Sequence, residues 1–177
     1  CPFTTSWPVW VFIDNLSAWD GVSVSDAKGR PMFNSLPQVK HIAMMASWVK
    51  ANYFHPAGRR DEGDKRFASG ECAMLTSTSS LYPQLLANKT VEAGVSALPY
   101  NDDVYGAPKN TLADGASLWA LDKLSPAETR GVAQFVNYLL SPEVQINMTT
   151  AGGFLPLTPV AKATASSRLL NQDMAAL

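Results

Sequence analysis

The residues of this sequence with the clearest chemical potential are suited to binding a ligand rather than to catalysing a reaction. Trp7 and Trp10 stand three positions apart, where a short extended run gives way to a helical one. Their indole rings offer flat apolar faces to the C–H surface of a polyol or sugar. Residues 76–80, TSTSS, lie between a predicted strand and a predicted helix, so their N–H groups and hydroxyls are placed to hold an anion. Gly115 begins another predicted strand and allows close backbone approach.

Each of these features has a structural alternative. Tryptophans in an apolar helix usually pack into a core, and this applies to Trp10 as much as a ligand role does. A serine cluster before a helix usually serves as its cap. The mixed-charge run at residues 59–71, RRDEGDKRFASGE, is interpreted as a solvated helical face rather than a binding patch.

The sequence carries none of the usual signatures of catalysis. It has no G-x-S-x-G elbow, phosphate-binding Walker loop, G-x-G-x-x-G or H-E-x-x-H. His41 and His55 lack metal-ligand spacing, and His41 falls beside the apolar face of a predicted helix, where a packing or surface role is expected. Asp102, Asp103 and Asp114 share a loop region, which leaves a paired-carboxylate enzyme as the alternative. We therefore predict a protein that is not an enzyme and uses no cofactor or metal.

Composition narrows the class further. The chain has 177 residues, a net charge of −1 and 46% hydrophobic residues, enough for a domain with a real core and no basic field for nucleic acid. It contains no run of 18 apolar residues. Its start at Cys1 without methionine and its end in NQDMAAL predict a fragment or a processed chain. Its two cysteines, Cys1 and Cys72, are compatible with one disulfide in an oxidising compartment or with two buried thiols.

Strand and helix patterns alternate along the chain. Strands are predicted at residues 3–5, 72–77, 91–100 and 116–121. Helices are predicted to begin near Ser6, Ser35, Leu81, Ser125, Ser141 and Thr158. The helix after Ser35 has apolar residues at 36, 39, 42, 45, 46 and 49, a 3.6-residue stripe that makes it the clearest helix of the chain. The alternation predicts an α/β fold whose sheet is at least partly parallel.

Several motifs occur together in a fixed order. They are S-W-x-x-W (6–10), N-x-S-A-W-D-G (15–21), QVKHIAM (38–44), GRRDE (58–62), F-x-x-G-E-C-A-M (67–74), LPY (98–100), GASLW (115–119) and GFLPLT (153–158). Over nearly all 177 residues the chain resembles the periplasmic glycerol-3-phosphate-binding proteins of ABC importers, within the extracellular solute-binding proteins. The F-x-x-G-x-x-A-M pattern alone would indicate only the wider class.

The resemblance implies a fold of two α/β lobes joined by a hinge, with ligand bound in the cleft between them. This chain would supply a periplasmic-binding-protein type II-like lobe, with a mixed, mostly parallel sheet flanked by helices. Residues 1–115 would be the second lobe, 116–150 a hinge-crossing strand with helices that pack towards the first lobe, and 151–177 a return segment. The first lobe, which would supply about half of the ligand contacts, would be largely absent.

The resemblance also implies a ligand site. Its positions in this chain are Trp7, Trp10, Ser79, Ser80, Gly115 and Phe154. Phe154 stands where the family has a tyrosine, and the chain stops before an arginine expected to pair with the ligand's phosphate. Both cysteines fall at positions that are cysteine in the family, which together with a periplasmic location favours the Cys1–Cys72 disulfide.

The function implied is that of the substrate-binding component of an ABC importer. It would bind sn-glycerol-3-phosphate or a glycerophosphodiester, without nucleic acid, and deliver it to the membrane permease subunits from the periplasm. The alternatives are a protein of the same architecture that binds a neutral sugar or oligosaccharide, a truncated lobe with no independent ligand binding, and a glycerophosphodiester hydrolase.

Overall fold

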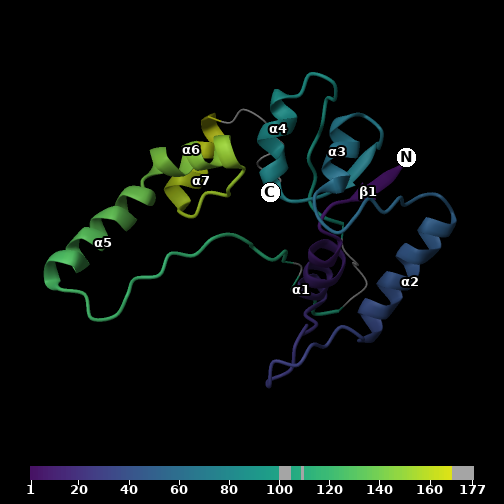
Figure 1. The fold of residues 1–177 in the computed structure, drawn as a ribbon, viewed down its shortest axis with the longest axis horizontal. Coiled ribbons are helices and arrows are strands. Elements are labelled where there is room, and N and C mark those ends of the chain that lie inside the picture. Colours follow the sequence, from purple (N-terminus) through teal and green to yellow (C-terminus); the bar gives the residue numbers. More distant parts are fainter. Residues whose placement is uncertain (100–104, 109, 169–177) are drawn as a thin grey trace. The chain divides into compact units, whose positions relative to one another are not determined.

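The computed structural model describes residues 1–99, 105–108 and 110–168, and Figure 1 traces their path. The chain divides into two compact units. Unit 1 comprises Cys1–Thr78, Asn88–Glu92 and Leu98–Ala113, and unit 2 comprises Ser79–Ala87, Ala93–Ala97 and Asp114–Leu177. Among the described residues, no helix is both long and apolar enough to cross a membrane.

Unit 1 is built on a parallel pair of strands. Its elements are β1 (Phe3–Thr5), a wide π-type helical turn (Trp10–Asn15), α1 (Leu16–Asp20), α2 (Leu36–Lys50), α3 (Glu62–Ala68) and β2 (Met74–Thr76). Phe3 of β1 lies opposite Met74 of β2, and Thr5 lies opposite Thr76. The parallel pairing confirms the predicted α/β class and the predicted strands at 3–5 and 72–77.

The core of unit 1 forms where the helix after β1 meets α2. Val11, Phe12, Met45 and Phe54 are its buried residues, and the ring centroids of Phe12 and Phe54 are 5.5 Å apart in an edge-on arrangement. Phe3 of β1 packs against the same cluster. Burial of these rings, each worth roughly 1.5–3 kcal/mol, fixes the helices beside the strand pair.

The predicted helix with its apolar stripe is present as α2, but most of the stripe is exposed. Of its positions only Met45 is buried, whereas Leu36, Val39, Ile42, Ala46 and Val49 are exposed. Gln38 is wholly buried instead, because its side chain closes the cap at Ser35 and its Nε2 donates to the Ser17 hydroxyl at 2.7 Å. Part of the apolar surface of α2 therefore faces outward while this polar side chain is buried.

Unit 2 is helical. It contains a 3₁₀ turn (Ser79–Leu81), α4 (Tyr82–Ala87), α5 (Pro126–Leu139), α6 (Pro142–Gly152) and α7 (Pro159–Arg168), and α6 and α7 lie side by side (Figure 1). α5 begins with the predicted capping box, in which Ser125 N–H donates to Glu128 at 2.8 Å. Gln145 of α6 accepts from Leu157 N–H at 2.7 Å and donates to the Thr158 hydroxyl at 3.0 Å, which ties α6 to the start of α7.

The two later predicted strands are wrong. Residues 91–99 and 116–121 form no strand, and Tyr100 lies outside the described residues. Leu118, Trp119 and Leu121 are 69–89% exposed. Alternating apolar residues specify a strand only where a neighbouring edge accepts and donates its backbone hydrogen bonds, and these segments have no such partner within the described part of the chain.

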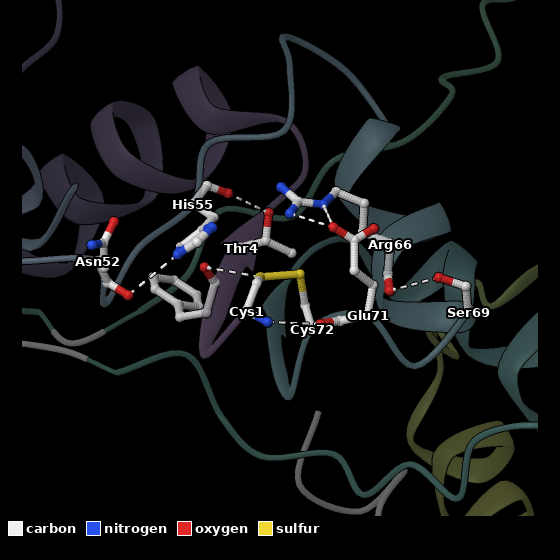
Figure 2. Close-up of a disulfide and its surroundings, with 9 residues drawn as sticks. Cys1, Thr4, Asn52, His55, Arg66, Ser69, Glu71 and Cys72 are labelled. Carbon is white, nitrogen blue, oxygen red and sulfur yellow. Dashed lines mark hydrogen bonds and ion pairs between the residues drawn. A yellow bond between two sulfur atoms is a disulfide. The ribbon is translucent and has the colours of Figure 1, made fainter.

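A disulfide closes the amino end of the strand pair (Figure 2). It joins Cys1, just before β1, to Cys72, just before β2, with 4.4 Å between their Cα atoms. The amino group of Cys1 donates to the Glu71 carbonyl at 2.8 Å, and the Glu71 carboxylate pairs with the Arg66 guanidinium at 2.5 Å. The amino end of the sheet is therefore fixed covalently and by hydrogen bonds.

Candidate functional site

The opposite, carboxyl end of the strand pair carries the first predicted site residue, Trp7. Ser6, just before it, is wholly buried and its N–H donates to the Thr76 carbonyl of β2 at 2.9 Å. Trp7 itself is 38% exposed and has φ +51°, a left-handed conformation that is rare for a bulky residue. Its N–H donates to the Arg60 carbonyl at 2.7 Å. Strain of this kind persists only where surrounding contacts hold it and is common at ligand sites.

Trp10 lies in a different environment. It is half-buried and packs against the Val11–Phe12–Met45–Phe54 core. Its carbonyl accepts from the Asn15 side chain at 2.9 Å, a contact within the π-type turn. The structure therefore gives Trp10 a clear packing role, and its ligand contact stays a prediction.

A partly buried hydrogen-bond network begins at Ser6, the residue before Trp7. The Ser6 hydroxyl accepts from Asp64 N–H at 2.9 Å, and the Asp64 carboxylate accepts from the Ser77 hydroxyl at 2.7 Å. Gly63 makes this contact possible, since a Cβ there would meet the Thr5 backbone and come within 2.9 Å of the Ser6 hydroxyl. These bonds join the first turn of α3 to the residues that directly follow β1 and β2. We call Ser6, Trp7, Arg60, Asp64 and Ser77 the strand-end cluster.

In unit 2 the structure brings together three other predicted residues. Ser79 and Ser80 open the 3₁₀ turn, and Gly153 ends α6 with φ +69°. A Cβ on Gly153 would overlap the Ser79 carbonyl and lie 2.8 Å from the Ser80 Cα. Phe154, which follows, is 49% exposed. The serine turn and residues 153–154 therefore form one surface, although Ser79 and Phe154 are 75 positions apart in sequence.

Gly115 is not packed into that surface. Apart from its chain neighbours, no atom of the described residues lies within 4 Å of the place a Cβ would take, and its φ is +151°. Its N–H donates to the carboxylate of the preceding Asp114 at 2.7 Å. Its role in binding stays a prediction.

Several carboxyl and imidazole groups of unit 1 have shifted pKa values. Hydrogen bonds from the N–H groups of Glu62 itself and of Arg60 hold the pKa of the Glu62 carboxyl below its usual range. Burial raises the pKa of Asp14. Burial also lowers the pKa of His41, against the opposing charge of Asp20, and the His41 Nε2 is buried without a hydrogen-bond partner in the described structure. His41 thus packs, with its ring centroid 5.6 Å from that of Phe12.

No group of three or more His, Cys, Asp or Glu side chains gathers as a metal site within the residues described. The groups at the strand-end cluster are instead hydroxyls, backbone amides, an indole, an arginine and the Asp64 carboxylate, which already accepts from the Ser77 hydroxyl. This set can hold a polar ligand by hydrogen bonds and cover its carbon atoms with an aromatic ring.

Comparison with known proteins identifies the family. The model of the bacterial extracellular solute-binding proteins matches residues 3–175. The chain belongs to this family. Its members bind solutes, and the family predicted from the motifs is confirmed. The chain is similar to the sn-glycerol-3-phosphate-binding periplasmic protein UgpB of Pectobacterium atrosepticum, with 35% identity over 168 residues, and to that of Salmonella typhimurium, with 33%. Each alignment covers 91% of this chain and 38% of the relative, so the chain spans well under half of their length.

A solved structure has a similar fold over most of this chain. UgpB from Mycobacterium tuberculosis, in complex with glycerophosphocholine, matches 96% of this chain and 43% of its own, with a TM-score of 0.64 and 18% identity. At this identity the likeness concerns the fold, and it confirms the predicted α/β solute-binding architecture.

Sequence reasoning missed Arg60, Asp64 and Ser77 as part of the strand-end cluster. It treated residues 59–71 as a solvated face because the run mixes both charge signs. The available signal was the GRRDE motif itself, which stands just before an α3 helix that returns to β2. Only the parallel strand pairing shows that the start of α3 meets the end of β1.

Proposed function

We propose that this chain is part of the substrate-binding component of an ABC importer in the periplasm. Its ligand is sn-glycerol-3-phosphate or a glycerophosphodiester, bound in the cleft of a two-lobed protein and delivered to the membrane permease without any bond being made or broken. The observation that carries this proposal is the 33–35% identity to glycerol-3-phosphate-binding proteins over 168 collinear residues.

The domain assignment belongs to the same proposal. Residues 1–115 form the second lobe, 116–150 cross the hinge and 151–177 return, while the first lobe lies in the part of the relatives that this chain does not match. The chain spans 38% of those relatives, so the first lobe would supply ligand contacts of its own.

The geometry of the described residues supports a ligand at Trp7. The indole is exposed, its backbone is held in a left-handed conformation by the Arg60 carbonyl, and it stands at the carboxyl end of a parallel strand. Ligands of open α/β sheets bind at this end. In unit 2, the packed surface of Ser79, Ser80, Gly153 and Phe154 offers hydroxyls and a ring.

The test is a titration of the intact protein that carries these 177 residues. sn-Glycerol-3-phosphate and glycerophosphocholine are added while tryptophan fluorescence and heat are recorded. We expect saturable binding that Trp7→Ala abolishes. Tyr53→Ala removes another exposed ring of unit 1, 62% exposed, and should leave the affinity unchanged.

Other outcomes would replace the proposal. Binding of maltose but not of either phosphate compound would indicate a neutral-sugar binder. Absence of binding in the 177-residue chain, with binding in the intact protein, would show that the other lobe is required. Release of choline from glycerophosphocholine would establish a hydrolase.

A further inference from the structure

We propose that Asp64 is a positioning residue for ligand binding. Its carboxylate, through the Ser77 hydroxyl, keeps the backbone of Trp7 in the conformation that presents the indole to the ligand. This inference rests on the proposed function, since it concerns the same ligand and the same tryptophan. Asp64 acts through the residues that it joins and not by touching the ligand.

The backbone of Trp7 needs support from its surroundings. Its φ of +51° lies in a region that is unfavourable for a bulky residue and persists only where neighbouring contacts impose it. The backbone fixes the Cα–Cβ bond, so a return to a right-handed φ would point the indole, which is 38% exposed, in another direction. The direction of the ring therefore depends on the bonds that hold position 7.

Those bonds come from the strand pair and from the start of α3. Ser6 is wholly buried, its N–H donates to the Thr76 carbonyl at 2.9 Å, and its hydroxyl accepts from Asp64 N–H at 2.9 Å. Trp7 N–H donates to the Arg60 carbonyl at 2.7 Å. Residue 60 lies two positions before α3 and residue 64 lies in its first turn. The conformation at Trp7 therefore depends on where α3 begins relative to the strands.

The side chain of Asp64 fixes the start of α3 to the other strand. Its Oδ1 accepts from the Ser77 hydroxyl at 2.7 Å, and Ser77 directly follows β2. Asp64 thus bonds the end of β1 with its backbone and the end of β2 with its side chain. A hydrogen bond to a charged acceptor is stronger than one between neutral groups. A substitution can remove this link and leave the bond from the residue 64 N–H to Ser6 in place.

The experiment is calorimetric titration of sn-glycerol-3-phosphate into the intact protein and its Asp64→Ala, Asp64→Asn and Ser77→Ala variants, each with its Tm recorded. Both alanine variants lose the bond, so we expect each to raise Kd about 5-fold, as residues that act on a site through others can do. The double alanine variant should bind no more weakly than either single one, because both changes remove the same bond. Asp64→Asn loses the charge but keeps an oxygen acceptor for Ser77, and should restore Kd to within about twofold of the parent.

The matched control is Asn88→Ala, which removes a side-chain bond at the other end of α3. Asn88 Nδ2 donates to the carbonyl of Ala68, the last residue of that helix, at 2.7 Å. Its loss should lower the Tm as the loss of the Asp64–Ser77 bond does, but change Kd by less than about twofold, since it leaves the bonds around Trp7 intact. A difference in Kd at equal loss of Tm separates positioning from stability.

Two results would overturn the role of Asp64 in a parent protein that binds. One is an equal change of Kd in Ser77→Ala and Asn88→Ala, and the other is an equal change in Asp64→Ala and Asp64→Asn. If Asp64→Ala does not fold, Ser77→Ala decides the question, because it removes the same bond and leaves the carboxylate. A parent protein that binds no phosphate compound would overturn the proposed function and this inference together.

Discussion

Breaking the Cys1–Cys72 disulfide should destabilise the protein strongly and weaken ligand binding with it. The bridge closes a loop with a sequence separation of 71 residues. Loop-closure entropy for a cross-link of this size corresponds to about 4 kcal/mol of unfolding free energy. For a cooperative unit of 177 residues that equals a fall in Tm of about 10 °C, and for a larger unit the fall is smaller.

The effect on binding has a structural route. The disulfide precedes both β1 and β2, and these three-residue strands end directly at Ser6 and Ser77. Loss of strand pairing would release the Ser6 N–H bond to Thr76 and the backbone that holds Trp7. We therefore expect Cys1→Ser/Cys72→Ser to lower the Tm and to raise the Kd for sn-glycerol-3-phosphate.

The assay is thermal and urea unfolding of the intact protein with and without dithiothreitol. These are the only two cysteines among the 177 residues. The double variant is therefore the control for the reductant, and its Tm should not change when dithiothreitol is added. A loss of less than about 1 kcal/mol on reduction would refute the reasoning, because it would mean that the loop is constrained equally well without the bridge.

Three further predictions concern single residues. Gly153→Ala should lower the Tm by several degrees and weaken ligand binding, because its Cβ would overlap the Ser79 carbonyl at a left-handed φ. The control is Gly131→Ala, in open space within α5, which should be neutral or stabilising by up to about 1 kcal/mol. Phe154→Tyr should tighten sn-glycerol-3-phosphate binding by up to about 10-fold in calorimetry, from one hydrogen bond of about 0.5–1.5 kcal/mol; an unchanged Kd would place the ring away from the ligand. Because burial lowers the pKa of His41, the unfolded chain binds its proton first, so stability should fall as pH drops below the ordinary histidine value of 6.5. His41→Phe should flatten the difference in urea midpoint between pH 7.5 and 5.5, and an identical difference in both proteins would contradict this.

The sequence predicts the elements of this chain well where they depend on interactions between residues that are close in sequence. Ser125 and Glu128 form the predicted capping box, and the strand at Phe3–Thr5 lies where expected. Caps and strand ends depend on residues a few positions apart, so the sequence contains the whole interaction. The family motifs add the fold class, because they fix many such positions at once.

The sequence fails where the outcome depends on a partner distant in the chain. The segment 116–121 has strand-like side chains but meets no strand edge. The apolar stripe of α2 has the right period, yet most of it is exposed while Gln38, bonded to Ser17 21 positions away, is buried. Site residues follow the same division. Trp7 is recognisable from its motif, whereas its contact with Arg60 becomes visible only when β1 and α3 are seen together.

The parallel pairing of β1 and β2 separates the end of the strands that carries the disulfide from the end that leads to Trp7. Parallel strands place both amino ends at one edge and both carboxyl ends at the other. The disulfide fastens the amino edge, while Ser6, Trp7 and Ser77 emerge at the carboxyl edge. A register of only three residue pairs separates the two edges, too short to be stable by its own hydrogen bonds. A covalent bond at one edge therefore helps to fix the register at the other.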